Sequence, residues 1–314
     1  MSAQQNLIYN GDFEIYDTCP TNYSAPWDLQ INYCNGWTTP TYATSDYFNS
    51  CSSSILTMVP SNGMGVQNPK NGNGYCGLIA YSSSSGGCYS GNFWWEYIQG
   101  HFISPLLSGH TYNFGFYVSL ADYSNIAIKN IGLYISQNSI ITPTCSPAPI
   151  YVTPNIVNTA GILSDTSNWI LISGTYNALG GEKFITIGHF ADSLTTDTSQ
   201  IAPIFSSPFS YYYVDGTYTY DVTDSNYSAP CEIILPNIFT PNDDTVNDVL
   251  RFTTCNKIKK ISIYNRWGNE VFITDKMNYW DGRTTSGEPC NDGNYFYVLQ
   301  TEEKIYKGLV QLIR

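Results

Sequence analysis

The stretch Thr111-Tyr-Asn-Phe-Gly-Phe-Tyr-Val-Ser119 sets a pattern that recurs along most of the chain. Aromatic and β-branched residues alternate in it with small or polar ones, and a period of two is typical of a β-strand. Similar short runs follow, each bounded by turn-forming residues: Ile131–Ser136, Trp169–Ser173, Phe184–Gly188 and Tyr211–Val214. We find no segment with a convincing helical period, so the pattern predicts an all-β protein built of sandwiches.

The composition favours a folded protein without membrane-spanning helices. Of the 314 residues, 42% are hydrophobic, 15% are aromatic and only 12% are charged, whereas disorder requires many charges and few aromatics. No run of about 18 apolar residues occurs, so no transmembrane segment is expected. The net charge of −12 argues against nucleic-acid binding, which needs clustered Lys and Arg.

Charge divides the chain into two parts. Residues 1–231 contain three Lys and no Arg against 14 acids, whereas residues 232–314 contain 10 cations and 11 acids. This change, together with the polar segment that precedes it, predicts a domain boundary near residue 231. We expect a signal remnant or tag scar at 1–5, a first domain at 6–222, a linker at 223–231 and a second domain at 232–314.

The cysteine content indicates an oxidising compartment. Nine cysteines occur without any C-x-x-C pair, which argues against zinc ribbons and thioredoxin-like chemistry. Disulfides in an exported protein are the favoured explanation, and a few buried free cysteines are the alternative. Because nine is odd, at least one thiol is free or pairs with another chain. The start, Met1–Gln5, lacks an apolar stretch, so we expect a missing signal peptide and maturation after Ala3.

The most specific pattern lies in five C-terminal blocks: Leu235–Asp248, Ile261–Phe272, Tyr279–Gly282, Asp292–Val298 and Tyr306–Arg314. In this order they resemble the gliding-motility-associated C-terminal domain of Bacteroidota, the type B sorting signal of the type IX secretion system. The family's acidic block usually reads Pro-Asn-Gly-Asp-Gly-x-Asn-Asp. Here Asp243 and Thr245 replace its two glycines.

The resemblance implies a small Ig-like β-sandwich and an export route. A signal peptide followed by the type IX translocon would take the protein to the outer cell surface, where a shuttle protein of the outer membrane handles such cargo. The family signature is carried over at these positions: Pro241, Asn242, Asp244, Asn247, Asp248, Asn265, Arg266, Trp267, Gly268, Trp280, Gly282, Gly293, Tyr295 and Gly308.

Elementary chemistry gives several of these residues structural roles. Trp267 and Trp280 are expected in the core because each buries a large area. Arg266 is expected to lock a loop through bidentate hydrogen bonds, and Gly268 to supply a positive φ in a turn. Related domains often carry cysteines at two of the positions found here, which favours a Cys255–Cys290 disulfide. Cys231–Cys255 is the alternative pairing.

The first domain resembles, more loosely, a jelly-roll module of the carbohydrate-binding type. Such modules precede peptidoglycan-binding OmpA domains or sorting domains in Bacteroidota surface proteins. Asn6–Glu14 looks like their first strand and Tyr211–Gly216 like their last. In carbohydrate-binding jelly rolls these strands often share a structural calcium ion, which implicates Glu14 and Asp215 by position. Two solvated edge carboxylates are the alternative.

Two further sites are candidates for ligands. The acidic block offers Asn242, Asp244 and Asp248, whose oxygens suit calcium, although an Asx-rich turn without metal is the alternative. Trp94 and Trp95 are consecutive, so on a strand they point to opposite faces. We expect one of them in the core and the other as an exposed platform for sugar binding.

Catalysis finds little support. The sequence contains no His-Glu-x-x-His, Gly-x-Ser-x-Gly or P-loop motif, and no catalytic residue can be selected. We therefore expect a non-enzymatic surface protein, an adhesin or glycan-binding module with a link to gliding motility. Its partners would be a surface polysaccharide or a larger surface adhesin. One alternative is a structural module that docks to another surface protein, and another is a glycan hydrolase with a carboxylate pair.

Overall fold

The computed structural model describes residues 5–41, 43–82, 94–142, 150–191, 195–203, 208–223, 237–242, 247–252, 257–302 and 305–314. The chain forms two compact units, Met1–Ser228 and Ala229–Arg314. This division falls inside the segment expected to be a linker. Both units are all-β, and the helical structure within the described ranges is one short 3-10 helix, η1 (Gln30–Tyr33). No described helix has the length and apolar character needed to cross a membrane.

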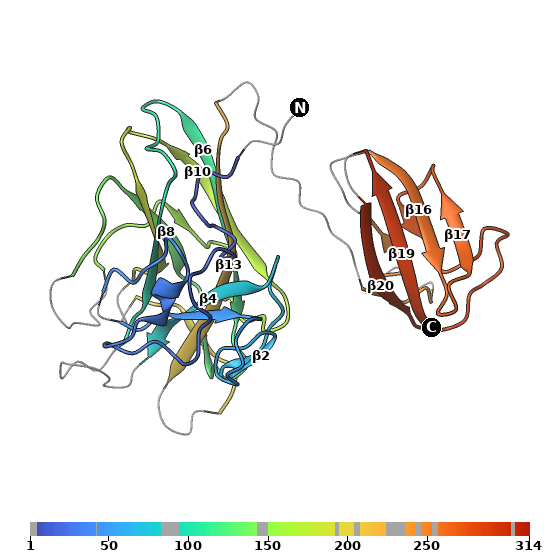
Figure 1. Ribbon diagram of the computed structural model, residues 1–314, viewed down its shortest axis with the longest axis horizontal. Coiled ribbons are helices and arrows are strands. Elements are labelled where there is room, and N and C mark those ends of the chain that lie inside the picture. The colour runs from blue at the N-terminus through green and yellow to red at the C-terminus, as the bar shows by residue number, and fades with distance from the viewer. Residues whose placement is uncertain are drawn as a thin grey trace. The chain divides into compact units, whose positions relative to one another are not determined.

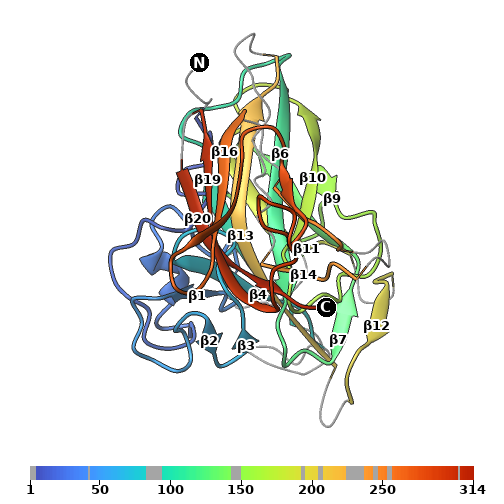
Figure 2. The same ribbon diagram turned by 90° about the vertical axis from the view of Figure 1, so that its right-hand side faces the viewer.

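Two antiparallel sheets form the jelly-roll sandwich of the first unit (Figure 1). One sheet has the order β1 (Asp46–Asn49), β4 (Gly74–Ser82), β13 (Phe209–Asp221), β6 (Thr111–Leu120) and β10 (Ile170–Asn177). The other has the order β5 (Tyr97–His101), β11 (Phe184–His189), β8 (Ile131–Ser136) and β9 (Ile156–Val157). Two short ribbons join β2 (Ser61–Asn62) to β3 (Gly65–Val66) and β7 (Ile126–Ile128) to β12 (Thr198–Gln200) (Figure 2).

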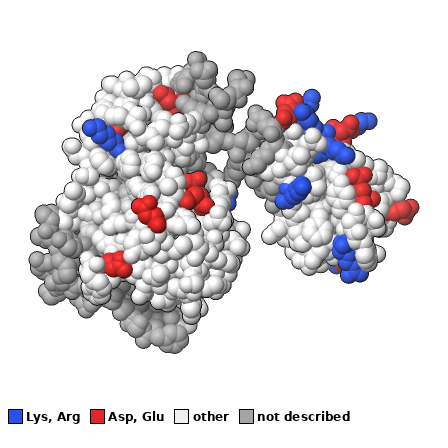
Figure 3. Space-filling model, viewed as in Figure 1, with Lys and Arg blue, Asp and Glu red and all other residues white. Residues whose placement is uncertain are grey.

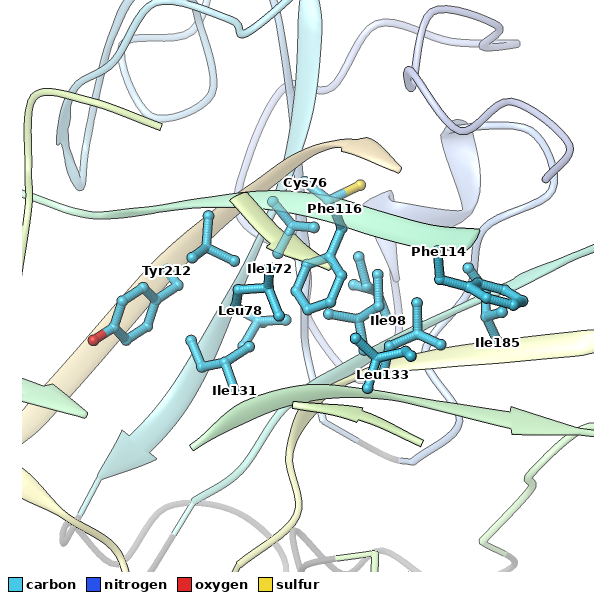
Figure 4. Packing of buried hydrophobic residues seen from close by; sticks show 14 of the residues in the cluster. Cys76, Leu78, Ile98, Phe114, Phe116, Ile131, Leu133, Ile172, Ile185 and Tyr212 are labelled. Atoms are coloured by element: carbon cyan, nitrogen blue, oxygen red, sulfur yellow. The ribbon is translucent and has the colours of Figure 1, made fainter. Parts of the chain in front are cut away.

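The core of this unit lies between the two sheets. Alternation along the strands turns Phe114 and Phe116 of β6 toward Ile98, Leu133 and Ile185 of the opposite sheet, as Figure 4 shows. All five side chains are fully buried. The period-two pattern therefore identified β6, β8, β10, β11 and β13, because it follows the burial of one face of each strand.

The expected first strand, Asn6–Glu14, is wrong as a strand. The segment is not a regular strand: it forms an isolated bridge between Ile8 and Phe102, and single backbone hydrogen bonds join Leu7 to Thr219 and Gly11 to Thr217. Asn10 and Phe13 adopt φ values of 51° and 59°, and the Phe13 amide donates to the Asn10 carbonyl. The Asn-Gly-Asp sequence in the middle of this segment forms a turn, which ends strand pairing there. The expected last strand is confirmed as the middle of β13.

The second unit is a small sandwich. Its five-stranded sheet has the order β14 (Ile238–Phe239), β20 (Ile305–Leu312), β19 (Gly293–Thr301), β16 (Ile258–Tyr264) and β17 (Glu270–Thr274) (Figure 1). A ribbon of β15 (Leu250–Arg251) and β18 (Tyr279–Trp280) accompanies it. The core includes Trp280, Leu250, Ile263 and Leu299, which are all fully buried.

Candidate functional site

The turn between β16 and β17 carries four signature residues. The Asn265 side-chain oxygen accepts hydrogen bonds from the amides of Trp267 (3.1 Å) and Asn269 (3.0 Å). Gly268 has a φ of +82°, a conformation that side chains other than glycine rarely adopt. Asn265 and Gly268 therefore close the turn, as the sequence predicted for this glycine.

The two signature tryptophans have opposite environments. Trp280 is fully buried, and its indole nitrogen donates to the Arg283 carbonyl at 2.7 Å. Trp267 is 71% exposed, so the expectation that it packs in the core is wrong. It lies in the turn that connects β16 and β17, and the Arg266 guanidinium lies 4.3 Å from its ring centroid. Arg266 thus stacks on an aromatic ring, a cation–π contact, where a loop lock was expected.

Arg314 supplies the loop contacts that had been expected of Arg266. Its guanidinium donates to the carbonyls of Cys290 (2.6 Å) and Gly282 (3.2 Å) and lies 3.4 Å from the Asp292 carboxylate. Gly282 has a φ of +78°, and a Cβ there would approach the Arg314 guanidinium and the Leu312 side chain. This glycine is therefore required by both its backbone conformation and its close neighbours.

The remaining signature residues support strands and turns. Tyr295 is buried and its hydroxyl donates to the Asn291 carbonyl at 2.7 Å. Gly293 has a φ of +144° at the start of β19. Gly308 pairs with Tyr297 across the strands, and the Tyr297 ring covers the space that a side chain would need.

The acidic block is only partly described. The Asn242 amide donates to the Asp248 carboxylate at 3.0 Å, and the Thr240 amide donates to the Asn247 carbonyl at 2.9 Å. Asn247 has a φ of 56°, which Asn tolerates better than most residues. Pro241 precedes this turn, whereas Asp244 lies outside the described residues. The described part is a loop closed by the Asp248 carboxylate, and calcium binding there stays a prediction.

The expected Cys255–Cys290 disulfide stays a prediction, because it involves a residue outside the described part of the chain. Cys290 is a buried free thiol that belongs to the core cluster of the second unit. Its thiol forms a hydrogen bond with the Tyr295 hydroxyl, and burial raises the pKa of the thiol. Cys290 therefore packs as a small hydrophobic residue. Cys255 and Cys231 lie outside the described residues. A disulfide that the sequence could not assign joins Cys19 to Cys51 in the first unit.

Glu14 and Asp215 converge on one loop, residues 70–74. Asp215 is fully buried, and its carboxylate accepts the amides of Lys70 (2.7 Å), Asn71 (3.4 Å) and Gly216 (2.6 Å). The Glu14 carboxylate accepts the amides of Asn73 and Gly74 at 2.7 and 2.9 Å. A register shift in β13 between Asp215 and Tyr218 marks a bulge, which redirects the Asp215 side chain.

The electrostatics of this pair suit a hard cation. Burial raises the pKa of Asp215 to about 8, despite three backbone hydrogen bonds, and the charge of Glu14 raises it further. Two carboxylate oxygens from distant parts of the chain are the ligand type that Ca²⁺ prefers. The described residues contain no group of three or more His, Cys, Asp or Glu arranged around a metal. The partners named above for both carboxylates are N–H donors, and calcium binding by Glu14 and Asp215 stays a prediction.

The two expected ligand tryptophans do not form an exposed platform. Trp95 is 5% exposed, and its indole nitrogen donates to Nδ1 of the buried His189 at 3.0 Å. Trp95 is therefore a core residue, and its assignment to a ligand site is wrong. Trp94 is half-buried, and its indole nitrogen donates to the Glu96 carboxylate at 2.9 Å. Both indole N–H groups are thus used inside the fold.

A buried carboxylate pair accompanies Trp94 but is closed to substrate. Asp46 and Glu96 are 4% and 1% exposed. The Glu96 carboxylate accepts hydrogen bonds from Thr44, Ile79 and Trp94, and Asp46 accepts from the Ser24 amide and the Tyr211 hydroxyl. Burial raises the pKa of Asp46 well above its usual range, and the neighbouring Glu96 raises it further. These carboxylates connect strands, and their burial keeps a glycosidic bond from reaching them.

Sequence reasoning missed an exposed tryptophan on a fixed turn. Trp27 is 88% exposed. The Ala25 amide donates to the Asp28 carbonyl at 2.9 Å and the Asp28 amide to the Ala25 carbonyl at 2.8 Å, so Pro26 and Trp27 form the tip of a two-residue hairpin turn. The Asp28 carboxylate accepts the Tyr33 hydroxyl at 2.9 Å, which fixes the turn on η1. The Ala-Pro-Trp-Asp sequence, with Pro in a turn, was the available signal.

A pocket of about 330 Å³ lies beside this turn. Its lining residues are uncharged and combine apolar surface with hydroxyl groups: Pro26, Leu29, Thr39, Pro40, Thr41, Ile141 and Thr142. The Thr142 side chain and amide both donate to the Pro40 carbonyl, so the two walls are joined. Pro26 and Leu29 connect the pocket to the turn that exposes Trp27. A pocket with a few polar groups close to an exposed aromatic residue is a geometry suited to a small ligand.

A second hollow of about 440 Å³ is less available for binding. It is lined by Tyr134, Gln137, Tyr176 and Glu182, among others. The Glu182 carboxylate already accepts the Tyr176 hydroxyl at 2.8 Å and the amides of Leu179 and Gly180. Its most polar group is therefore occupied within the fold, and the Trp27 pocket is the better candidate.

Comparison with known proteins assigns the second unit. Residues 233–312 match the model of the CHU_C type IX secretion signal domain. No curated protein matches the chain significantly. The chain therefore carries a signal that marks cargo of the type IX secretion system for export to the cell surface or the medium.

Solved structures give only distant similarities. The CBM22-1–GH10 modules of the xylanase 10B of Clostridium thermocellum, complexed with xylohexaose, match with 11% identity and a TM-score of 0.31, over 72% of this chain and 32% of that one. The adhesin domain of Epf from Streptococcus pyogenes matches with 9% identity and a TM-score of 0.29, over 100% of this chain and 99% of that one. The K1 cleaved adhesin domain of Lys-gingipain from Porphyromonas gingivalis matches with 15% identity and a TM-score of 0.28, over 60% of this chain and 91% of that one. The chain thus spans about a third of the xylanase structure.

Proposed function

We propose that this type IX cargo is a non-catalytic protein of the cell surface whose first unit binds a neutral saccharide at the Trp27 turn. The observation that carries the proposal is the 88% exposure of Trp27 on a turn held by backbone hydrogen bonds. An exposed indole offers a flat apolar face to a sugar ring, and the hydrogen-bonded turn already fixes the backbone that carries it.

The charge of the first unit favours a neutral ligand. Residues 1–231 contain three cations, Lys70, Lys129 and Lys183, and the face of this unit in Figure 3 is mostly uncharged. Recognition of sulfate or carboxylate groups depends on Arg and Lys, and the lining of the pocket contains neither. The Thr39 and Thr142 hydroxyls already donate to backbone carbonyls, so toward sugar hydroxyls they would act as acceptors.

Calcium is part of the same proposal. Glu14 and Asp215 would hold a structural ion that fixes loop 70–74 against β13. The buried Asp215 carboxylate supports this role, because a cation would offset a charge that burial destabilises. We expect the ion to stabilise the first unit without contacting the saccharide.

The test is binding of the full chain to a panel of neutral polysaccharides, with the Trp27→Ala variant as the perturbation. Removing the indole that would stack on the sugar ring should weaken binding by at least about tenfold, because tryptophans commonly dominate binding energies. Trp267→Ala is the matched control, since Trp267 is also exposed but belongs to the second unit. It should bind like the wild type.

Three outcomes would contradict the proposal in different ways. Saccharide binding that Trp27→Ala leaves unchanged would place the site elsewhere. Binding to whole bacterial cells but to no saccharide would favour docking to another surface protein, the alternative function. Release of shortened sugar chains would favour a hydrolase.

A further inference from the structure

Two buried cysteines lie against one another in the core of the first unit. Cys34 and Cys76 are both fully buried free thiols of the same hydrophobic cluster. Their thiols form a hydrogen bond, and the Tyr47 side chain lies beside both. The Asn10 amide group also donates to the Cys34 sulfur at 3.3 Å. Figure 4 shows the Cys76 sulfur at one edge of the packed side chains.

The backbones of the two cysteines are positioned by different elements. Cys34 follows η1 and forms an isolated bridge with Tyr16. Cys76 lies inside β4, where it pairs with Tyr47 of β1 and Val214 of β13. The thiols therefore meet because the N-terminal segment packs against β4 of the larger sheet. Cys19–Cys51 joins the same segment to the end of β1.

The export signal indicates whether this thiol pair meets oxidising or reducing conditions. A type IX cargo passes through compartments outside the cytoplasm, where neighbouring thiols are oxidised. We propose that Cys34 and Cys76 form a second disulfide in the exported protein. Both S–H bonds break and one S–S bond forms. The two protons and two electrons convert the disulfide of a thiol–disulfide oxidoreductase to two thiols.

The burial of the pair sets the order of events. A thiol must be a thiolate to attack a disulfide, and burial, followed by the hydrogen bond to Cys34, raises the pKa of the Cys76 thiol well above its usual range. Oxidation therefore takes place before the core closes, while both thiols are in water. Once closed, the bond is shielded from reductants. It would confine residues 34–76 in the unfolded chain and so stabilise the fold.

Non-reducing peptide mapping of the full chain, isolated after export, tests this pairing. The protein is denatured in iodoacetamide without reductant and digested with chymotrypsin. Trypsin is unsuitable because no Lys or Arg precedes Lys70, so Cys19, Cys34 and Cys51 would remain in one peptide. Chymotrypsin cleaves after Tyr33 and Tyr75 and thus separates the cysteines. The expected product is a linked Cys34–Cys76 peptide that lacks two hydrogen atoms relative to its two parts.

Alkylated Cys34 and Cys76, or either one linked to another cysteine, would overturn the proposal. The linked Cys19–Cys51 peptide from the same digest is the control that shows whether the protein was oxidised at all. If the Cys19–Cys51 disulfide is present while Cys34 and Cys76 are alkylated, the proposal fails. If neither bond forms in the exported protein, it fails as well.

Variants give an independent measurement. Cys34→Ala should make Cys76 fully reactive with iodoacetamide in denaturant, whereas in the wild type Cys76 should not react without reductant. Under non-reducing conditions Cys34→Ala/Cys76→Ala should lower the Tm of the first unit by about 10 °C, from the loop-entropy gain of a disulfide. A reductant present during refolding should lower the Tm of a Cys19→Ala/Cys51→Ala variant similarly, because that variant lacks the other disulfide. An unchanged Tm of that variant would contradict the pairing.

Discussion

Replacing Asp215 by Asn should flatten the pH dependence of stability in the first unit. Asp215 is fully buried at the bulge of β13, where it accepts three backbone amides. Asn keeps the size of the side chain and removes the charge. One of its two polar atoms is a donor, so the variant loses part of the amide contacts at every pH. The informative quantity is therefore the slope of stability against pH.

The magnitude follows from the shifted pKa. Burial raises the pKa of Asp215 from 3.8 to about 8. Between these two pH values the Asp215 carboxyl is protonated in the folded state but ionised in the unfolded state. The stability that this protonation contributes is therefore complete below about pH 4 and is lost as the pH rises to about 8. Each pH unit in this window corresponds to about 1.4 kcal/mol. Without calcium, the wild type should lose on the order of 4 kcal/mol more than the variant between pH 5 and pH 8.

Urea unfolding at a series of pH values, in chelator, measures this difference. Asp46 and Glu96 also have raised pKa values because of burial, but both are present in each protein and cancel in the comparison. Asp12→Asn, at an exposed position, controls for the change in net charge. Added calcium should restore wild-type stability near pH 8 and leave Asp215→Asn unaffected. Parallel slopes for wild type and Asp215→Asn in chelator would refute the assignment of a raised pKa to Asp215.

Three further predictions concern the second unit and the ligand turn. Trp280→Ala should destabilise the second unit by about 3–5 kcal/mol in denaturant unfolding, because it empties a fully buried site, whereas Trp267→Ala should change stability by less than about 0.5 kcal/mol. Gly282→Ala should cost at least about 1 kcal/mol in the same assay, since its φ of +78° is unfavourable for Ala; an unchanged midpoint would contradict the crowding against Leu312. Pro26→Gly should weaken saccharide binding several-fold in titration calorimetry by loosening the turn that carries Trp27, and equal affinity would show that the turn need not be rigid.

The sequence was most informative where one physical factor determines the structure. Alternation located β6 and β8 to within a residue, because each strand buries one face in a core. Asn6–Glu14 was misjudged because its local turn at Asn10 outweighs the apolar alternation around it.

Tertiary contacts explain the remaining differences. Trp267 is as hydrophobic as Trp280, and only its place at the tip of a turn leaves it exposed. Local sequence also gives no sign that Cys19 meets Cys51, or that Cys34 meets Cys76, because these contacts depend on how an irregular N-terminal segment packs. Trp27 was overlooked since exposure of a large aromatic residue cannot be derived from its type alone.

The most direct test of the account concerns export by the second unit. Residues 229–314 are fused to a foreign protein that carries a signal peptide, in a host with a type IX system. Surface accessibility to protease is compared with that of the same protein without the fusion. The account predicts that the fusion reaches the cell surface and the control stays in the periplasm. Periplasmic retention of a folded fusion would contradict the role of this unit as a type IX secretion signal.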